Sequence, residues 1–196
     1  MDEAALIVSA QNGEVDAFNQ LVLAHQRLVY NVAYRILGNE AGAMDATQDA
    51  FLRGYRALPK FRGGVFKAWI LRIVTNCCYD QLRAMKRRPT TPLHDLVEND
   101  EHSGLLEDHR ERPEAYVERQ ELNVVIQAGI DTLPTEQRVA VIMSDIQGLS
   151  YQEISLATMV SIGTVKSRIS RGRAKLRDYL IMHRELLPNG FRLSDE

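Results

Sequence analysis

The sequence is poor in cysteine and lacks any long apolar run. Its 196 residues include two cysteines, Cys77 and Cys78, which are adjacent and therefore cannot join in an ordinary disulfide. No second thiol or histidine lies at metal-ligand spacing, so no metal site is expected and both cysteines are predicted to be packing residues of a helix. No stretch approaches the roughly twenty apolar residues of a membrane span. The N-terminus also lacks the pattern of a signal peptide, so we expect no membrane insertion and a location in the reducing cytoplasm.

The sequence also lacks β-type alternation, internal repeats and a recognisable catalytic set. Its hydroxyls, five histidines and acids form no nucleophile, metal or phosphate-loop pattern, so neither an enzyme nor a cofactor is expected. Apolar residues instead recur at helical spacing along most of the chain. We therefore predict an all-α protein with two small helical domains joined by a flexible acidic linker.

Composition sets the expected boundaries of the domains. The first domain is predicted at residues 1–90 and the second at 114–187, with a tail at 188–196. Between them, residues 91–113 lose the periodicity and gain proline and acids, which is typical of a flexible linker. The expected helices before the last two cover residues 16–37, 44–58, 66–86, 114–130 and 135–146. On the second of these, Phe51, Tyr55 and Leu58 are expected to face inward, and Thr135 is the candidate N-cap of the fifth.

The distribution of charge says more than the formal net charge of −2. Residues 60–92 hold eight Lys or Arg against the single acid Asp80, and residues 160–177 hold six against none. Residues 93–121 hold ten acids against three arginines. Two basic segments separated by an acidic one indicate two contacts with DNA, joined by a segment that repels it.

Residues 149–177 predict a helix-turn-helix. Ser150 and Glu153 form a candidate capping box for its first helix, and Ser161 is the candidate cap of the second. The second helix has an apolar stripe of Ile162, Val165, Ile169 and Leu176. Its other faces carry six cations: Lys166, Arg168, Arg171, Arg173, Lys175 and Arg177. Such a helix suits insertion into the major groove of DNA, although a solvated basic face on a surface helix is the simpler alternative.

These motifs resemble those of bacterial sigma factors, in particular the extracytoplasmic-function group of the sigma-70 family. The resemblance rests on four segments in the family's order: DATQDAFLRGYRAL at 45–58, FRGG to KRR at 61–88, LPTEQRVAVIMSDIQGLSYQEI at 133–154, and GTVKSRISRGRAKLR at 163–177. It implies a promoter-specificity subunit that binds core RNA polymerase, recognises the minus-35 and minus-10 elements of promoter DNA and supports melting.

The resemblance implies contacts with the clamp coiled coil of the polymerase's largest subunit and with the flap of the second subunit. The residues that match the clamp-binding surface are Asp45, Gln48, Asp49, Phe51 and Arg53. An ordinary solvated helix face is the alternative for these charges. Met44 stands where the family usually has an acid. The family also implies an anti-sigma factor as a further partner.

The first basic segment matches the family's minus-10 element. Its candidate residues are Lys60, Phe61, Arg62, Gly63, Gly64, Arg72, Asn76 and Arg83. A glycine-rich loop can close around an unstacked base, while the cations attract phosphate. Trp69 could stack on DNA or pack in the core, and its place on the apolar rail favours the core.

The second basic segment matches the minus-35 element. Its candidate residues are Thr164, Lys166, Ser167, Ser170, Arg171 and Arg173, of which Arg171 suits a bidentate contact with guanine. Met159 stands in the turn where the family often has glycine, so a positive φ there would strain it by about 1 kcal/mol or more.

Two other functions remain open on the residues alone. A conventional repressor or activator could use the same helix-turn-helix, but it would need a sensing or dimerising first domain, for which residues 45–88 offer no pattern. An adaptor or anti-termination protein could bind polymerase without reading DNA, and the cation-rich second helix argues against this.

Overall fold

The computed structural model describes residues 2–87 and 113–187, which form helices and contain no strand. The all-α prediction is confirmed. The linker predicted at 91–113 lies outside the described residues except for Pro113, and the tail predicted at 188–196 lies wholly outside them. Within the described ranges, no helix is both long and apolar enough to span a bilayer.

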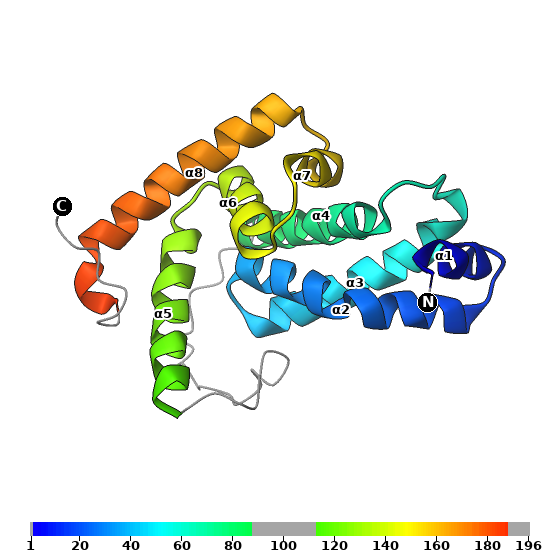
Figure 1. Ribbon diagram of the computed structural model, residues 1–196, viewed down its shortest axis with the longest axis horizontal. Helices are drawn as coiled ribbons and strands as arrows, with labels where there is room; N and C mark the ends of the chain where they lie inside the picture. The colour runs from blue at the N-terminus through cyan, green and yellow to red at the C-terminus, as the bar shows by residue number, and fades with distance from the viewer. Residues whose placement is uncertain (1, 88–112, 188–196) are drawn as a thin grey trace.

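The first half of the chain forms a bundle of four α-helices (Figure 1). These are α1 (Glu3–Gln11), α2 (Val15–Leu37), α3 (Glu40–Ala57) and α4 (Phe66–Arg87), with the short 3-10 turn η1 (Leu58–Lys60) after α3. Gly38 ends α2 with φ 75°, and Asn39 then accepts a hydrogen bond from Gly42 N at 2.7 Å to cap α3. The short helix α1 has no counterpart in the sequence prediction.

The second half contains α5 (Pro113–Asp131), α6 (Thr135–Val141), the π-helical turn η3 (Ile142–Ile146), α7 (Tyr151–Thr158), α8 (Ile162–Met182) and η4 (Arg184–Leu186). The helix predicted to run to residue 146 therefore changes its hydrogen bonding at Ile142. Thr135 was the wrong N-cap, because Pro134 occupies that position and makes no side-chain cap bond. A proline N-cap leaves the first amides without a side-chain acceptor, and Arg138 N and Gln137 N bond to Pro134 O instead.

Most residues predicted for the core are buried, with two exceptions. Phe51, Leu58, Cys77 and Cys78 are buried as expected. Tyr55 was predicted to face inward but is 40% exposed, since it lies at the edge of the core, where its ring packs on Phe18 with the centroids 5.0 Å apart.

Ile162 is the other exception, also 40% exposed, so the buried stripe of α8 begins one turn later. Val165, Ile169 and Gly172 form that stripe. Because Gly172 has no side chain, it lets α8 approach α6 closely at a position where the apolar pattern shows a gap.

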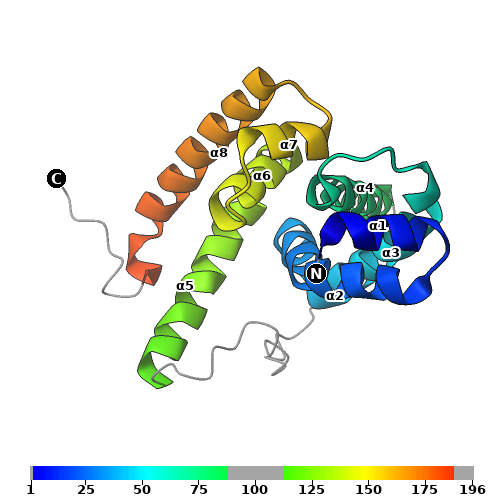
Figure 2. The same cartoon turned by 45° about the vertical axis from the view of Figure 1, so that its right-hand side comes forward.

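The two halves pack against each other, which the sequence did not predict. Helix α7 packs across α4, and α5 and α6 contact α2 (Figures 1 and 2). One hydrophobic cluster runs through both halves, from Phe66 and Leu71 of α4 to Ile154 and Ala157 of α7. The two helical units therefore form a closed arrangement in which they share a core.

Polar contacts reinforce this interface between the halves. Arg138 of α6 donates to Ile36 O of α2 at 2.8 Å and pairs with Asp131 at 3.2 Å. Arg35 of α2 donates to two residues of α5, Asn123 at 2.9 Å and Gln127 at 3.2 Å. Lys67 of α4 lies 3.4 Å from Glu153 of α7. Burial lowers the pKa of Arg35 and raises that of Asp131, so desolvation opposes the charged forms that the interface uses.

Two glycines of α8 predict opposite effects of the same substitution on stability. A Cβ on Gly172 would lie 2.6 Å from Val141 Cγ2, whereas one on Gly163 would meet nothing closer than Ser161 Oγ at 3.8 Å. Gly172→Ala should therefore lower the free energy of unfolding by about 1–3 kcal/mol through overpacking. Gly163→Ala should raise it by up to about 1 kcal/mol, because alanine favours the helix. Thermal unfolding followed by circular dichroism measures both, and shifts of the same sign would contradict the packing of α8 on α6.

Candidate nucleic-acid interface

The helix-turn-helix is built from local capping signals. Ser150 Oγ accepts from Glu153 N at 3.2 Å while Glu153 Oε2 accepts from Ser150 N at 2.8 Å, which completes the predicted capping box. These bonds to Ser150 lower the pKa of Glu153. Ser161 caps α8 by accepting from Thr164 N at 3.2 Å. Both predicted caps are confirmed, and they fix where α7 and α8 begin.

The turn between α7 and α8 contains a strained methionine. Met159 ends α7 with φ 57° and ψ 37°, and it is the one non-glycine residue with positive φ among those described. A residue with a Cβ is strained there by about 1 kcal/mol or more, as the sequence analysis expected. The side chain is 63% exposed, so burial does not offset this strain. The turn is therefore held by the capping and packing of the flanking helices.

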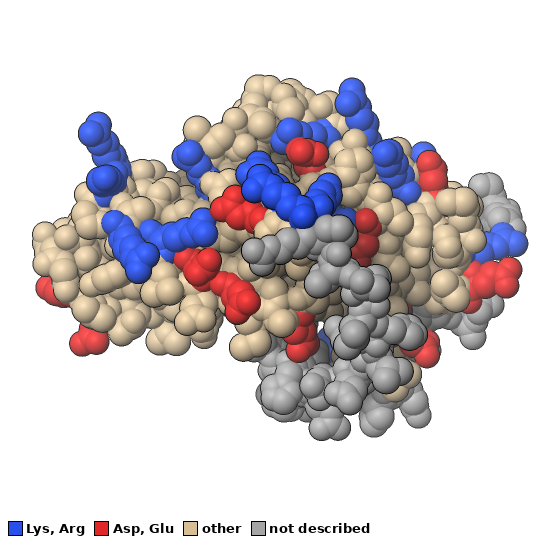
Figure 3. Space-filling model, turned by 180° about the vertical axis from the view of Figure 1, so that it is seen from behind, with Lys and Arg blue, Asp and Glu red and all other residues tan. Residues whose placement is uncertain are grey.

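The outer face of α8 carries the residues predicted for minus-35 recognition. Lys166, Ser170 and Arg171 are exposed, and Thr164 and Ser167 are half-buried. Thr164 Oγ1 lies 3.0 Å from Ser161 Oγ, and Ser167 Oγ donates to Thr164 O at 2.9 Å, so both hydroxyls are partly engaged within the helix. Figure 3 shows Lys and Arg side chains projecting from the upper part of the molecule, where α8 lies in that reversed view. This face can present cations and short polar groups to a groove of DNA.

Arg173 differs from the other cations of this face because it is held by a carboxylate. Its Nη2 and Nε donate to the two oxygens of Asp145 at 2.6 and 2.9 Å, a bidentate pair that joins α8 to η3. Arg173 stays half-exposed, so one side of its guanidinium can still face a phosphate. The pair fixes the orientation of α8 as well as that of the arginine.

The Arg173–Asp145 pair predicts a pH-dependent stability. Hydrogen bonds from Arg173 hold the pKa of Asp145 below its usual range, so the folded state favours the ionised carboxylate. That stabilisation is present above the ordinary carboxyl pKa of about 4 and is lost as the pH falls through the lower folded value. Asp145→Asn should therefore be less stable than the wild type at pH 7 and similar to it at low pH. Urea unfolding across this range measures the difference, with Asp178→Asn on the exposed side of α8 as the control. A deficit independent of pH would contradict the ion pair.

The predicted minus-10 loop is anchored at its start and open in its middle. Phe61 is half-buried against Trp69 and Phe66, with ring centroids 5.0 and 6.1 Å apart. Gly63 and Gly64 have φ of 89° and 104°, and a Cβ at either position would find no atom within 4 Å. These glycines are thus required by the backbone conformation and not by crowding. Lys60 and Arg62 are exposed beside them.

Helix α4 continues this surface beyond the loop. Arg72, Asn76 and Arg83 are exposed on it, while Trp69 is half-buried in the aromatic group with Phe61 and Phe66. The structure therefore agrees with the packing interpretation of Trp69. Arg83 lies 3.5 Å from Asp80, the lone acid of this segment.

The residues predicted to bind polymerase lie along the outer face of α3. Asp45, Gln48, Asp49 and Arg53 are exposed, together with Met44, while Phe51 is buried and can act only by supporting the face from beneath. Arg53 contacts Asp49 at 3.5 Å and Asp80 of α4 at 3.3 Å. Its hydrogen bond to Asp80 raises the pKa of Arg53. This surface therefore combines an acidic turn with an arginine that is tied to the next helix.

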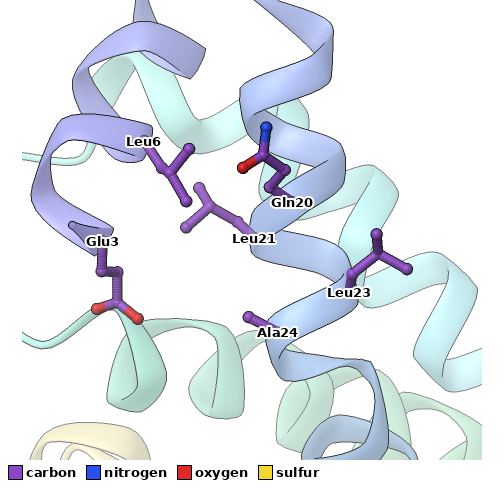
Figure 4. Close-up of a pocket in the computed structure, with 6 residues that line it drawn as sticks. All are labelled: Glu3, Leu6, Gln20, Leu21, Leu23 and Ala24. Atoms are coloured by element: carbon purple, nitrogen blue, oxygen red, sulfur yellow. The ribbon is translucent and has the colours of Figure 1, made fainter. Parts of the chain in front are cut away.

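The first half of the chain also contains a groove. A groove of about 390 Å³ lies between α1 and α2 and is lined mainly by apolar groups of Leu6, Leu21, Leu23 and Ala24 (Figure 4). Its carboxylate, Glu3, contacts His25 at 2.8 Å. Across residues 2–87 and 113–187, no group of three His, Cys, Asp or Glu could hold a metal ion.

Sequence reasoning missed residues that act through distant contacts. Gln11 belongs to no motif, and Asp145 lies inside the segment 133–154 with nothing to mark it as a partner of Arg173; the partners of both are at least 28 residues away. Arg35 and Arg138, which join the two halves, were also missed, since their partners are backbone carbonyls and amides. Among these partner residues, only Asp80 was conspicuous in the sequence, because it is the single acid of the basic segment 60–92.

Comparison with known protein families agrees with the resemblance to sigma factors seen in the sequence. The family Sigma-70 region 2 matches residues 21–88, and the family Sigma-70, region 4 matches residues 124–176. The first covers most of α2 and all of α3 and α4, including the loop, and the second covers the end of α5 through most of α8. Both matches thus include the surfaces described above.

Individual proteins resemble the chain over most of its length. It is 37% identical to the ECF RNA polymerase sigma factor SigE of Mycolicibacterium smegmatis, over 92% of this chain and 68% of that protein. It is 35% identical to the ECF RNA polymerase sigma-E factor of Escherichia coli K12, over 88% and 91%. The solved structure of CnrH in complex with the cytosolic domain of CnrY matches with a TM-score of 0.63 and 28% identity, over 90% of this chain and 95% of that one. The chain therefore belongs to the sigma-70 family, in its extracytoplasmic-function (ECF) group, and is a promoter-recognising sigma subunit of RNA polymerase.

Proposed function

We propose that this sigma factor divides polymerase binding and promoter recognition among three surfaces, with α3 binding polymerase and α4 with its loop and α8 recognising the promoter. The observation that carries the proposal is the exposed row of Lys166, Ser170 and Arg171 on a helix whose start is capped by Ser161. On this proposal α8 enters the major groove at the minus-35 element, where Arg171 can bond O6 and N7 of a guanine together. Thr164 and Arg173 contact the DNA backbone.

The second surface captures the melted minus-10 strand. Extracting a base from the stack costs a few kcal/mol, which a protein recovers by enclosing the base and binding its backbone. The open glycine loop gives room for a base, and Lys60, Arg62, Arg72 and Arg83 supply positive charge. Asn76 can offer both a donor and an acceptor to a base edge.

The third surface docks on core polymerase. Asp45, Gln48, Asp49 and Arg53 face solvent on α3, above the buried Phe51. They bind the clamp coiled coil of the largest subunit, and the second domain meets the flap of the second subunit. The work takes place in the cytoplasm, where polymerase and promoter DNA are found.

Promoter binding requires the closed arrangement to open. A compact chain of this length has a radius of gyration of about 16 Å and hence a diameter near about 40 Å. Elements centred at minus-35 and minus-10 are separated by about 25 base pairs, or about 85 Å of duplex. Contacts such as those of Arg138 and Arg35 must therefore break before both elements are read. A regulatory protein that stabilises the closed form would inhibit initiation, and CnrH, which is similar to this chain, was solved with a protein partner. An anti-sigma factor is accordingly the expected regulator.

Asn76→Ala is expected to separate capture of the minus-10 strand from recognition of minus-35. The amide lies on α4, so its loss should reduce opening of the minus-10 region while duplex binding at minus-35 stays unchanged. Permanganate footprinting with holoenzyme, on matched and pre-melted templates, distinguishes the two steps. If the variant weakened minus-35 duplex binding as much as Arg171→Ala does, the first domain would not be a strand-capturing module.

The whole proposal is tested by run-off transcription with core polymerase on a genomic promoter library. Initiation at a defined set of promoters, dependent on the added protein, is the expected result. Binding to DNA without core polymerase and without initiation would favour a conventional regulator. Co-purification with polymerase without a promoter shift would favour an adaptor.

A further inference from the structure

Gln11, the last residue of α1, holds the start of the minus-10 loop. Its Nε2 donates to Leu58 O at 3.0 Å and to Phe61 O at 2.7 Å, across 47 and 50 residues of sequence. The two carbonyls lie at either end of the short turn η1, immediately before the exposed residues of the loop. One side-chain amide thus bonds two backbone carbonyls where helical bonding ends, and Leu58 O also accepts from Phe61 N at 2.9 Å.

Helix α1 is itself fixed, so the amide of Gln11 has a rigid support. Leu6 and Ile7 pack against the core, and Ala10 is buried. Figure 4 shows Leu6 of α1 directed toward Leu21 of α2. At the other end of α1, Glu3 lies 2.8 Å from His25 of α2, whose ring packs against Phe66 at the start of α4.

The loop has a second anchor, which leaves its middle free. The ring of Phe61 packs against Trp69 and Phe66, so its backbone is fixed by Gln11 and its side chain by the aromatic group. After Phe61, residues 62–65 are exposed, and Gly63 and Gly64 have open space where a Cβ would lie. Because the loop is anchored at Phe61, its direction is fixed there, while residues 62–65 can still close around a ligand.

We propose that Gln11 is a positioning residue for capture of the melted minus-10 strand. Its two N–H groups hold the carbonyls of Leu58 and Phe61, so that Lys60 to Gly64 start from one defined conformation. Without this clamp the loop samples more conformations, and binding the strand must order them. The proposal rests on the proposed function, because it assigns α1 a role in the same capture step.

The amide chemistry gives a discriminating variant. Gln11→Glu keeps the size of the side chain but places a carboxylate, which only accepts, against two carbonyl oxygens. Gln11→Met keeps the length without either polar group. A matched control is Gln20→Glu, which makes the same change on α2 beside the groove. Loss of two hydrogen bonds predicts about tenfold weaker strand capture, or more, for both Gln11 variants.

The experiment uses the full chain in complex with core polymerase. Binding is measured to a fork template with single-stranded minus-10 DNA, to minus-35 duplex DNA and to core polymerase, and 2-aminopurine fluorescence reports base unstacking. We expect both Gln11 variants to lose affinity for the fork template alone, and Gln20→Glu to match the wild type.

The outcomes separate the two levels of the proposal. If the wild type captures the fork strand and the Gln11 variants match Gln20→Glu, the positioning role is overturned. Equal losses on all three partners would also overturn it, because they would indicate a general defect of the fold. If the wild type itself fails to capture the strand, the proposed function of this surface fails instead.

Discussion

Replacing Arg171 with alanine is expected to weaken binding to the minus-35 duplex by about 1–3 kcal/mol and to relax preference at one base pair. Arg171 is exposed on the outer face of α8, two residues before Arg173, which Asp145 holds. An exposed guanidinium on this face can bond two acceptors of a guanine. Fluorescence anisotropy with duplexes substituted one base pair at a time measures both the affinity and the preference.

A second cation of the same helix provides the control for this result. Lys175 is exposed one turn after Arg171. Lys175→Ala should lower affinity for every sequence to a similar degree and reduce its salt dependence, as expected for contact with phosphate. If Arg171→Ala also weakened all duplexes equally, Arg171 would be a phosphate contact, and another residue of α8 would read the base.

The parts of the fold that the sequence predicted well are those with local causes. Ser150, Glu153 and Ser161 bond to amides three residues away, so their pattern in the sequence is sufficient to place α7 and α8. The strain of Met159 could also be predicted, because the residue lies in the turn between two helices with recognisable caps. These elements belong to the candidate site, which explains why its position could be predicted.

The parts that were missed depend on contacts between distant segments. The π-helical turn at Ile142–Ile146 and the short helix α1 have no distinctive periodicity. Exposure of Ile162 depends on how α8 packs against α6, and the closed arrangement depends on Arg35 and Arg138 finding partners about 90 to 100 residues away. A helical pattern shows which side of a helix is apolar but not which helix covers it.

The candidate site was predicted as a set of side chains, without their partners. Arg53 and Arg173 were correctly placed on exposed faces, yet each is tied to an acid from another segment, Asp80 and Asp145. These pairs change how each arginine would act. An arginine already oriented by a carboxylate loses less conformational freedom when it binds a ligand.

Charge reversal at Asp49 is expected to have a large effect on polymerase binding. Asp49 is exposed on α3 one turn after Asp45, and its carboxylate lies 3.5 Å from Arg53. In Asp49→Lys the pair is replaced by two neighbouring cations, and the turn that holds Asp45 and position 49 loses all of its net negative charge. A reversed charge that repels its partner costs more binding free energy than the simple loss of a charge at the rim of an interface. We expect the affinity for core polymerase to fall at least about tenfold, or about 1.4 kcal/mol.

Two variants show whether this loss belongs to the surface. Glu121→Lys makes the same charge change on α5, and Asp49→Asn removes the charge without reversing it. The first should bind polymerase like the wild type, and the second should lie between the wild type and Asp49→Lys. Affinity is measured with fluorescently labelled protein, and circular dichroism shows that each variant is folded. Because Asp49 is exposed and its ion pair adds little to stability, a change in fold is not expected. Unchanged affinity in a folded Asp49→Lys protein would remove α3 from the docking surface and leave polymerase binding to other faces of the molecule.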